Sequence, residues 1–123
     1  MQQNPVQVYN LGKLGIIGMK GCEDLVEKVD RYLMDFCEGS GAEPHSFVIP
    51  VNCPRFGTGE AKAVVLHSVR TYDIYIICDP FNYGVTYKMY GVEHSMSPDD
   101  HFQDLKRVIS ALGGKAKRIT VIM

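Results

Sequence analysis

The sequence has no surplus of charge of either sign and no long apolar run. Its 13 basic and 14 acidic residues leave a net charge of -1, so it lacks the electrostatic footprint of a protein that binds nucleic acid or an anionic membrane. No apolar stretch reaches the roughly 20 residues of a membrane-spanning helix. The first ten residues have neither the basic start nor the apolar core of a signal peptide. We therefore expect a cytoplasmic protein without nucleic-acid or membrane partners.

Motifs for metal binding, redox chemistry and nucleophilic catalysis are also missing. The cysteines are too far apart for a CxxC pair, and the histidines show neither HxH nor HxxxH spacing. We expect reduced thiols, histidines on the surface or in loops, and no metal site. No nucleophile lies beside an obvious base, so we expect no catalytic residue in this chain. The residues concerned are Cys22, Cys37, Cys53, Cys78, His45, His67, His94 and His101.

The composition is that of a folded domain with a substantial core. The chain has 123 residues, of which 46% are hydrophobic and 22% are charged, and it contains no repeat. A chain of this length forms one domain and buries about two thirds of the surface that its unfolded form exposes.

Apolar runs of strand length alternate with segments of helical period. The strands are expected at 14–19, 47–49, 61–66, 74–77 and 117–123, and the helices at about 22–39 and 98–112. This β-α-β-β-β-α-β order predicts an α/β fold with a mostly parallel sheet and a hairpin-like turn between the second and third strands. Residues 78–96 are expected to form a long loop.

The two helices differ in how clearly the sequence marks them. In the second, Ser97 is a favoured N-cap residue, and Pro98 and two acids follow it in the first turn. In the first, the pattern predicts one apolar and one polar face. The predicted apolar positions are Leu25, Val26, Val29, Leu33, Phe36 and Cys37, and the predicted polar ones are Glu27, Lys28, Asp30 and Arg31.

A glycine-containing segment, residues 57–62, lies between the second and third expected strands. It lacks the GxxxxGK[ST] spacing of a phosphate-binding loop and leads into no helix. We therefore interpret it as a turn whose glycines supply positive φ angles. Phe56 and Glu60 flank this turn, and together they would offer a base an aromatic face and a hydrogen-bond acceptor.

The last apolar segment, residues 117–123, runs to Met123 without a polar tail. We expect a flexible segment at 1–13 and an α/β domain at 14–123 that continues in a longer protein.

The segment FGTGEAKAVVLHSVRTYDIYII, residues 56–77, resembles the N-terminal half-domain of ribose-phosphate pyrophosphokinase, also called phosphoribosyl pyrophosphate synthetase. The most specific pieces are Phe56-x-x-x-Glu60 and Ser68-Val69-Arg70 followed by Asp73. The resemblance extends over roughly residues 14–123 and implies a phosphoribosyltransferase-like fold. That family transfers the diphosphoryl group of Mg-ATP to ribose 5-phosphate, which gives phosphoribosyl pyrophosphate and AMP.

The resemblance also implies roles for individual residues. Phe56 would stack on adenine, and Thr58 and Glu60 would bind its edge, in the ATP site of a neighbouring subunit of a homo-oligomer. Arg70 would lie where bacterial members bind regulatory phosphate or ADP. The family's metal-binding, basic and ribose-phosphate-binding segments would follow Met123, so the full-length parent would need Mg²⁺ and ATP, whereas this chain alone would be inactive and would need no cofactor.

Two departures from the family keep other interpretations open. Thr58 replaces the family's usual asparagine, and residues 78–96 are longer than the corresponding loop of common members. A non-catalytic regulatory homologue that assembles with active subunits is one alternative. An unrelated small α/β nucleotide-binding module is the other.

Overall fold

A parallel three-stranded sheet forms the centre of the protein. The computed structural model describes residues 12–41, 43 and 45–123; the expected segment at 1–13 lies almost wholly outside them. The sheet contains β1 (Lys13–Gly18), β4 (Tyr72–Ile77) and β7 (Arg118–Ile122), in the order β1-β4-β7. Both pairs are parallel, with Lys13 opposite Tyr72 and Asp73 opposite Arg118. The predicted α/β class and parallel sheet are confirmed.

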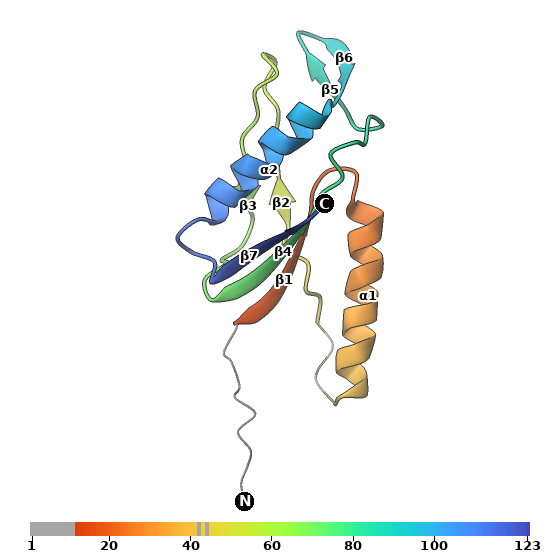
Figure 1. Cartoon of the computed structure of the whole chain (residues 1–123), viewed down its shortest axis with the longest axis vertical. Coiled ribbons are helices and arrows are strands. Elements are labelled where there is room, and N and C mark those ends of the chain that lie inside the picture. Colours follow the sequence, from red (N-terminus) through yellow and green to blue (C-terminus); the bar gives the residue numbers. More distant parts are fainter. Residues whose placement is uncertain (1–11, 42, 44) are drawn as a thin grey trace, which may run out of the picture.

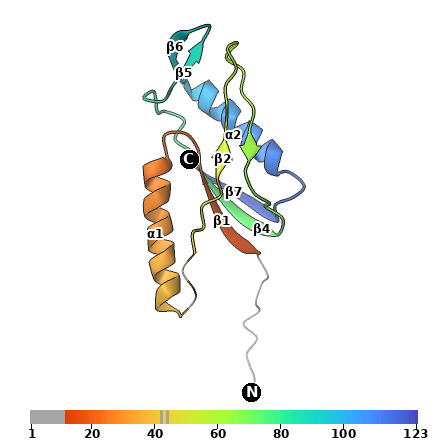
Figure 2. The same ribbon diagram turned by 180° about the vertical axis from the view of Figure 1, so that it is seen from behind.

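The two helices cover opposite faces of this sheet (Figures 1 and 2). Successive strand residues point to opposite faces, and the core divides accordingly. Ile17 and Ile76 pack with residues of α2 (Pro98–Leu112), whereas Ile16 and Ile77 pack with residues of α1 (Glu23–Gly39). Each apolar strand residue is therefore covered by a helix on its own side, as in a doubly wound α/β sheet.

Helix α2 begins where its capping signal predicts. The Ser97 hydroxyl accepts a hydrogen bond from the Asp100 amide at 3.2 Å, and the Asp100 carboxylate accepts one from the Ser97 amide at 2.9 Å. Two otherwise unpaired backbone donors are satisfied in this reciprocal way. On α2 the polar residues His101 and Asp104 are buried, whereas Phe102 is exposed. The expectation of a surface or loop position is wrong for His101.

The predicted faces of α1 are partly wrong as well. Val26 is buried, but Leu25 and Phe36 are exposed. Asp30, expected on the polar face, is buried because its carboxylate accepts hydrogen bonds from the Phe47 amide and the Ser46 hydroxyl, both at 2.7 Å. This carboxylate thereby fixes the chain as it returns from α1 to the edge of the sheet, where Val48 forms a parallel bridge to Ile16.

The connection from this edge to β4 is an antiparallel hairpin with very short strands, β2 (Val51–Asn52) and β3 (Val64–Val65). The strand expected at 47–49 is reduced to the bridge at Val48, and the strand expected at 61–66 is reduced to β3 and a bridge between Ala61 and Arg55. Pro50 and Pro54 limit how regular this stretch can be. The hairpin-like turn predicted between the second and third strands is present.

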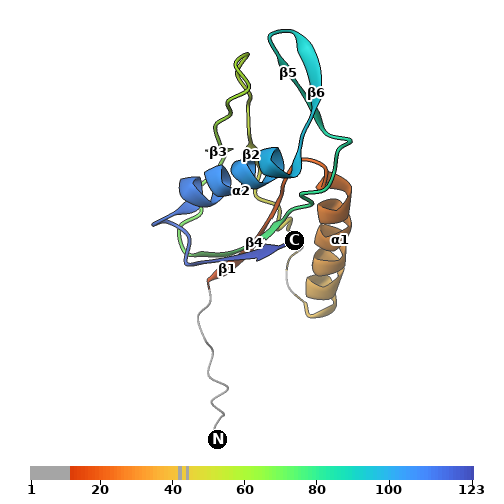
Figure 3. The same ribbon diagram turned by 45° about the horizontal axis from the view of Figure 1, so that its top comes forward.

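Residues 78–96 are not a plain loop. They contain the antiparallel hairpin β5 (Thr86–Met89) and β6 (Val92–Ser95), whose turn contains Tyr90 at φ 51° and Gly91 at φ 78°. The two hairpins project together on one side of the domain (Figures 1 and 3).

An ion pair joins β4 and β7 within the sheet. Arg118 donates to both carboxylate oxygens of Asp73, at 3.2 and 2.9 Å, and these hydrogen bonds raise the pKa of the Arg118 guanidinium. Because Asp73 is buried, this bidentate pair satisfies a carboxylate that would otherwise lie unpaired beside the core.

Candidate functional site

The turn at residues 56–60, which we call the 56–60 turn, forms the tip of the β2–β3 hairpin. The Phe56 amide donates to the Glu60 carbonyl at 2.7 Å, and the Gly59 amide donates to the Phe56 carbonyl at 2.9 Å. Gly59 has φ 93°, a conformation that favours glycine, as predicted from its place in the turn. Phe56 is 50% exposed, and Thr58 and Glu60 are also exposed. The structure thus brings these three predicted site residues into one accessible turn.

The β5–β6 hairpin contacts the 56–60 turn directly. The Tyr90 amide donates to the Gly57 carbonyl at 2.9 Å. A Cβ atom added at Gly59 would lie 2.8 Å from the Met89 sulfur, so a side chain at this position would require the Met89 side chain to move. The segment that the sequence predicts as a loop is therefore one wall of the candidate site.

Arg55 holds the base of the turn. Its Nη1 donates to the Gly59 carbonyl at 2.6 Å, and its Nη2 donates to Asp104 Oδ2 of α2 at 2.9 Å. Its guanidinium carbon lies 4.4 Å from the centre of the Tyr87 ring of β5, a distance at which a cation and an aromatic face attract each other. The Arg55 side chain is only 6% exposed. One side chain thus connects the turn, α2 and the second hairpin.

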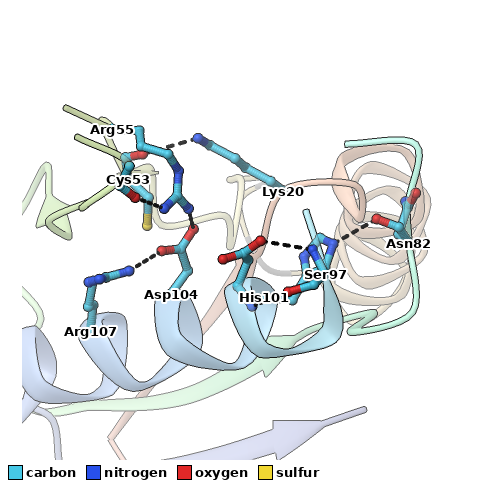
Figure 4. Close-up of polar contacts among 10 residues, drawn as sticks. Lys20, Cys53, Arg55, Asn82, Ser97, His101, Asp104 and Arg107 are labelled. Carbon is cyan, nitrogen blue, oxygen red and sulfur yellow. Dashed lines mark hydrogen bonds and ion pairs between the residues drawn. The ribbon is translucent and has the colours of Figure 1, made fainter. Parts of the chain in front are cut away.

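Asp104 of α2 supplies the negative charge that pairs with Arg55. Its carboxylate is 2% exposed and also accepts a hydrogen bond from Arg107 Nη1 at 2.6 Å. Figure 4 shows the Asp104 carboxylate between the guanidinium groups of Arg55 and Arg107. The Lys20 amine, drawn in the same view, donates to the Cys53 carbonyl at 3.1 Å. In sequence, an acidic residue within an apolar helical stripe could have marked this position. The local pattern gave no sign of its partner, because Arg55 lies 49 residues away.

Arg70 belongs to a different part of the surface. It lies in the connection from β3 to β4, and its amide donates to the Ser68 hydroxyl at 3.4 Å. With Lys115 it lines a shallow depression of about 350 Å³. None of the hydrogen bonds or ion pairs among the described residues joins Arg70 to the 56–60 turn, so the predicted site residues form two separate locations.

A pocket of about 420 Å³ lies beside the carboxyl end of β1, between α1 and residues 48–53. In open α/β sheets, ligands bind beyond the carboxyl ends of strands. Residues of both charges line this pocket, namely Lys20, Glu23, Glu27 and Asp30. Asp30 is already satisfied by the Ser46 and Phe47 hydrogen bonds.

Three of the four cysteines are poorly suited to nucleophilic chemistry. Burial raises the pKa of the Cys22 and Cys53 thiols and raises that of Cys78 to about 11, so their reactive thiolate forms are scarce near neutral pH. All four cysteines are free thiols, as predicted.

The described residues contain neither a cluster of metal-binding side chains nor a helix suited to spanning a membrane. Over residues 12–41, 43 and 45–123, no group of three or more metal-binding side chains comes together. In the same part of the chain, no helix is long and apolar enough to cross a membrane.

Comparison with known proteins gives a family match that includes the 56–60 turn. A search of curated proteins finds no match to this chain. Residues 14–123, by contrast, match the family described as the N-terminal domain of ribose phosphate pyrophosphokinase. The match covers the sheet from its second residue onward, together with both helices and both hairpins. This chain therefore belongs to the ribose-phosphate pyrophosphokinase family, of which it carries the N-terminal domain.

Proposed function

We propose that this chain is part of an enzyme that transfers the diphosphoryl group of Mg-ATP to ribose 5-phosphate, giving phosphoribosyl pyrophosphate and AMP. The observation that carries the proposal is the family match over residues 14–123. The matched region includes the exposed Phe56 on the 56–60 turn, to which Arg55 and Tyr90 donate hydrogen bonds. Within the enzyme, the chain contributes a subunit interface and one edge of an ATP site in a neighbouring subunit of a homo-oligomer.

Phe56, Thr58 and Glu60 recognise the adenine base in this proposal. The half-exposed Phe56 ring offers a face on which a flat base can stack. The Glu60 carboxylate can accept a hydrogen bond from the exocyclic amine, and the Thr58 hydroxyl can donate or accept one. The turn that carries these three residues projects from the domain (Figure 3), which suits a contact made to another subunit.

The groups that handle phosphate and Mg²⁺ are proposed to come from outside these 123 residues. Among the described residues, no three carboxylate, histidine or cysteine side chains converge. We assign no metal-dependent step to this chain. Diphosphoryl transfer depends on positioning and on neutralising charge, so the 123 residues alone are expected to be inactive.

Arg70 is proposed to bind a regulatory anion such as phosphate or the diphosphate of ADP. It is exposed and shares its depression with Lys115. Two cations on one concave surface attract phosphate groups. We further propose that residues 14–123 form the domain and that the protein is cytoplasmic.

The test is AMP formation from ATP and ribose 5-phosphate by the full-length product of the gene, with magnesium and phosphate present. We expect activity, and we expect Phe56→Ala to raise KM for ATP while KM for ribose 5-phosphate stays within twofold. Phe36→Ala is the matched control, because Phe36 is a more exposed phenylalanine on α1. Absence of AMP formation by the wild-type protein would refute the catalytic proposal.

A non-catalytic regulatory homologue is the second candidate. The observation that favours it is the β5–β6 hairpin beside the 56–60 turn, in a segment longer than the corresponding family loop. A protein that is inactive alone but changes the rate of an active subunit when the two are mixed would support this candidate.

A further inference from the structure

We propose that Arg55 is a positioning residue for nucleotide binding, and that the β5–β6 hairpin holds it in place through Tyr87. This inference rests on the proposed function, because it concerns how the 56–60 turn is presented to ATP. It adds Arg55 and Tyr87, neither of which contacts the base in the proposal, to the residues that determine ATP affinity.

The first support is the way in which Arg55 is held. Its two terminal nitrogens donate in different directions, to Gly59 of the turn and to Asp104 of α2. The face of the same guanidinium lies over the Tyr87 ring. A planar guanidinium with a fixed fork of donors is suited to three such contacts at once, whereas a lysine amine is not. Because the side chain is almost fully buried, water competes little for these contacts.

The second support is the pair of carbonyl groups on either side of Thr58. The Gly57 carbonyl accepts from the Tyr90 amide, and the Gly59 carbonyl accepts from Arg55 Nη1. The Gly57–Thr58 peptide group before Thr58 and the Gly59–Glu60 peptide group after it are therefore both oriented by contacts from outside the turn. Without them, two glycines at positions 57 and 59 would leave the backbone with wide conformational freedom.

The third support is that the holding elements are themselves ordered by local contacts. The Tyr87 ring stacks on His94 of the paired strand, with ring centres 5.8 Å apart. Asp104 is held by Arg107 on the next turn of α2. Arg55 is thus fixed from two elements, and the turn that follows it is pre-organised. A pre-organised site binds more tightly because less freedom is lost when the ligand arrives.

The kinetic test uses the full-length protein and three variants. Tyr87→Leu removes the aromatic face, and we expect KM for ATP to rise roughly tenfold while kcat and KM for ribose 5-phosphate stay within twofold. Tyr87→Phe keeps the ring and is expected to restore KM for ATP to within twofold of wild type. Tyr83→Leu is the matched control, since Tyr83 is an exposed tyrosine in the same segment. An equal rise in Tyr87→Leu and Tyr83→Leu would overturn the proposal.

Hydrogen exchange provides a readout that does not need activity. The Phe56, Gly59 and Tyr90 amides all donate hydrogen bonds in or onto the turn. In Tyr87→Leu we expect their exchange to be faster, while the amides of β4 keep wild-type rates and so report an intact sheet. Unchanged exchange at these three amides would overturn the positioning role. Faster exchange with an unchanged KM for ATP would overturn the link to nucleotide binding.

The two measurements separate this inference from the proposed function. If the wild-type protein forms no AMP, the catalytic proposal fails and the link to ATP fails with it. The exchange rates then decide, on their own, whether Tyr87 and Arg55 hold the turn. If AMP forms and KM for ATP rises only in Tyr87→Leu, both proposals are supported.

Discussion

Replacing Asp104 by alanine should be among the most destabilising single substitutions in this domain. The change removes a carboxylate that is 2% exposed and pairs with two guanidinium groups, at 2.9 Å from Arg55 and 2.6 Å from Arg107. Arg107 is partly exposed and can turn to solvent, but the Arg55 side chain is 6% exposed. A buried charge would lose its counterion, which costs about 3–5 kcal/mol.

The consequence for thermal stability follows from the length of the chain. For a domain of this size, each kcal/mol lowers Tm by about 4 °C, so Asp104→Ala should lower Tm by roughly 12–20 °C. Urea unfolding followed by far-ultraviolet circular dichroism, on the same protein, gives the free energy directly. Arg107→Ala is the control, because it leaves Arg55 paired and should cost only about 1 kcal/mol.

A double replacement tests the reasoning from the other direction. Arg55→Met combined with Asp104→Leu removes both buried charges and keeps the volume apolar, so it should recover most of the stability lost in Asp104→Ala. If Asp104→Ala lowers the free energy of unfolding no more than Arg107→Ala does, the buried pair of Arg55 and Asp104 does not stabilise the domain and the reasoning is refuted.

Three further predictions concern other parts of the fold. Gly15→Ala should destabilise by about 1–3 kcal/mol, because the new Cβ would lie 2.3 Å from Ile49 Cδ1, whereas Gly39→Ala meets no atom within 4 Å and should leave the urea midpoint almost unchanged. Ser97→Ala removes the N-cap of α2 and should cost about 1 kcal/mol in urea unfolding; an unchanged midpoint would contradict the capping role. Cys78, with a pKa of about 11, should have about 100-fold less thiolate at pH 8 than an ordinary thiol, so mass spectrometry should show slow alkylation by iodoacetamide that becomes fast in urea. Because this pKa is raised by folding, the associated stability is complete below about pH 9 and is lost as pH rises toward 11, which a pH series of unfolding curves would show.

The parts of the fold that the sequence predicted are those encoded by neighbouring residues. Ser97 and Pro98 mark the start of α2, since a capping box is made within four residues. The apolar run at 74–77 marks the central strand, because a strand buried on both faces needs apolar residues at every position. The 56–60 turn was predicted for the same reason, as Gly59 supplies its positive φ locally.

The parts that were missed depend on residues far apart or on weak alternation. The β5–β6 hairpin has exposed Thr86, Lys88, Glu93 and Ser95 and no regular apolar face, so its pattern resembles that of a loop. Asp30 looked like part of a polar helix face, but it is buried because backbone and hydroxyl donors from the returning chain reach it. The ion pair of Arg55 and Asp104 exists only once α2 has packed beside the hairpin, and no local pattern contains that information.

The parallel pairing of β4 with both β1 and β7 also has a consequence for how the chain folds during synthesis. Paired residues are 59 positions apart in β1–β4 and 45 positions apart in β4–β7, and such non-local contacts form slowly because a long loop must close first. The helices and the two hairpins close over short distances and can form as soon as they leave the ribosome. Ile74 and Ile76 are fully buried in the finished domain, but their strand lacks one of its two neighbours until β7 pairs with it. The interval before residues 118–122 emerge is therefore when the nascent chain is most prone to aggregate and most dependent on chaperones.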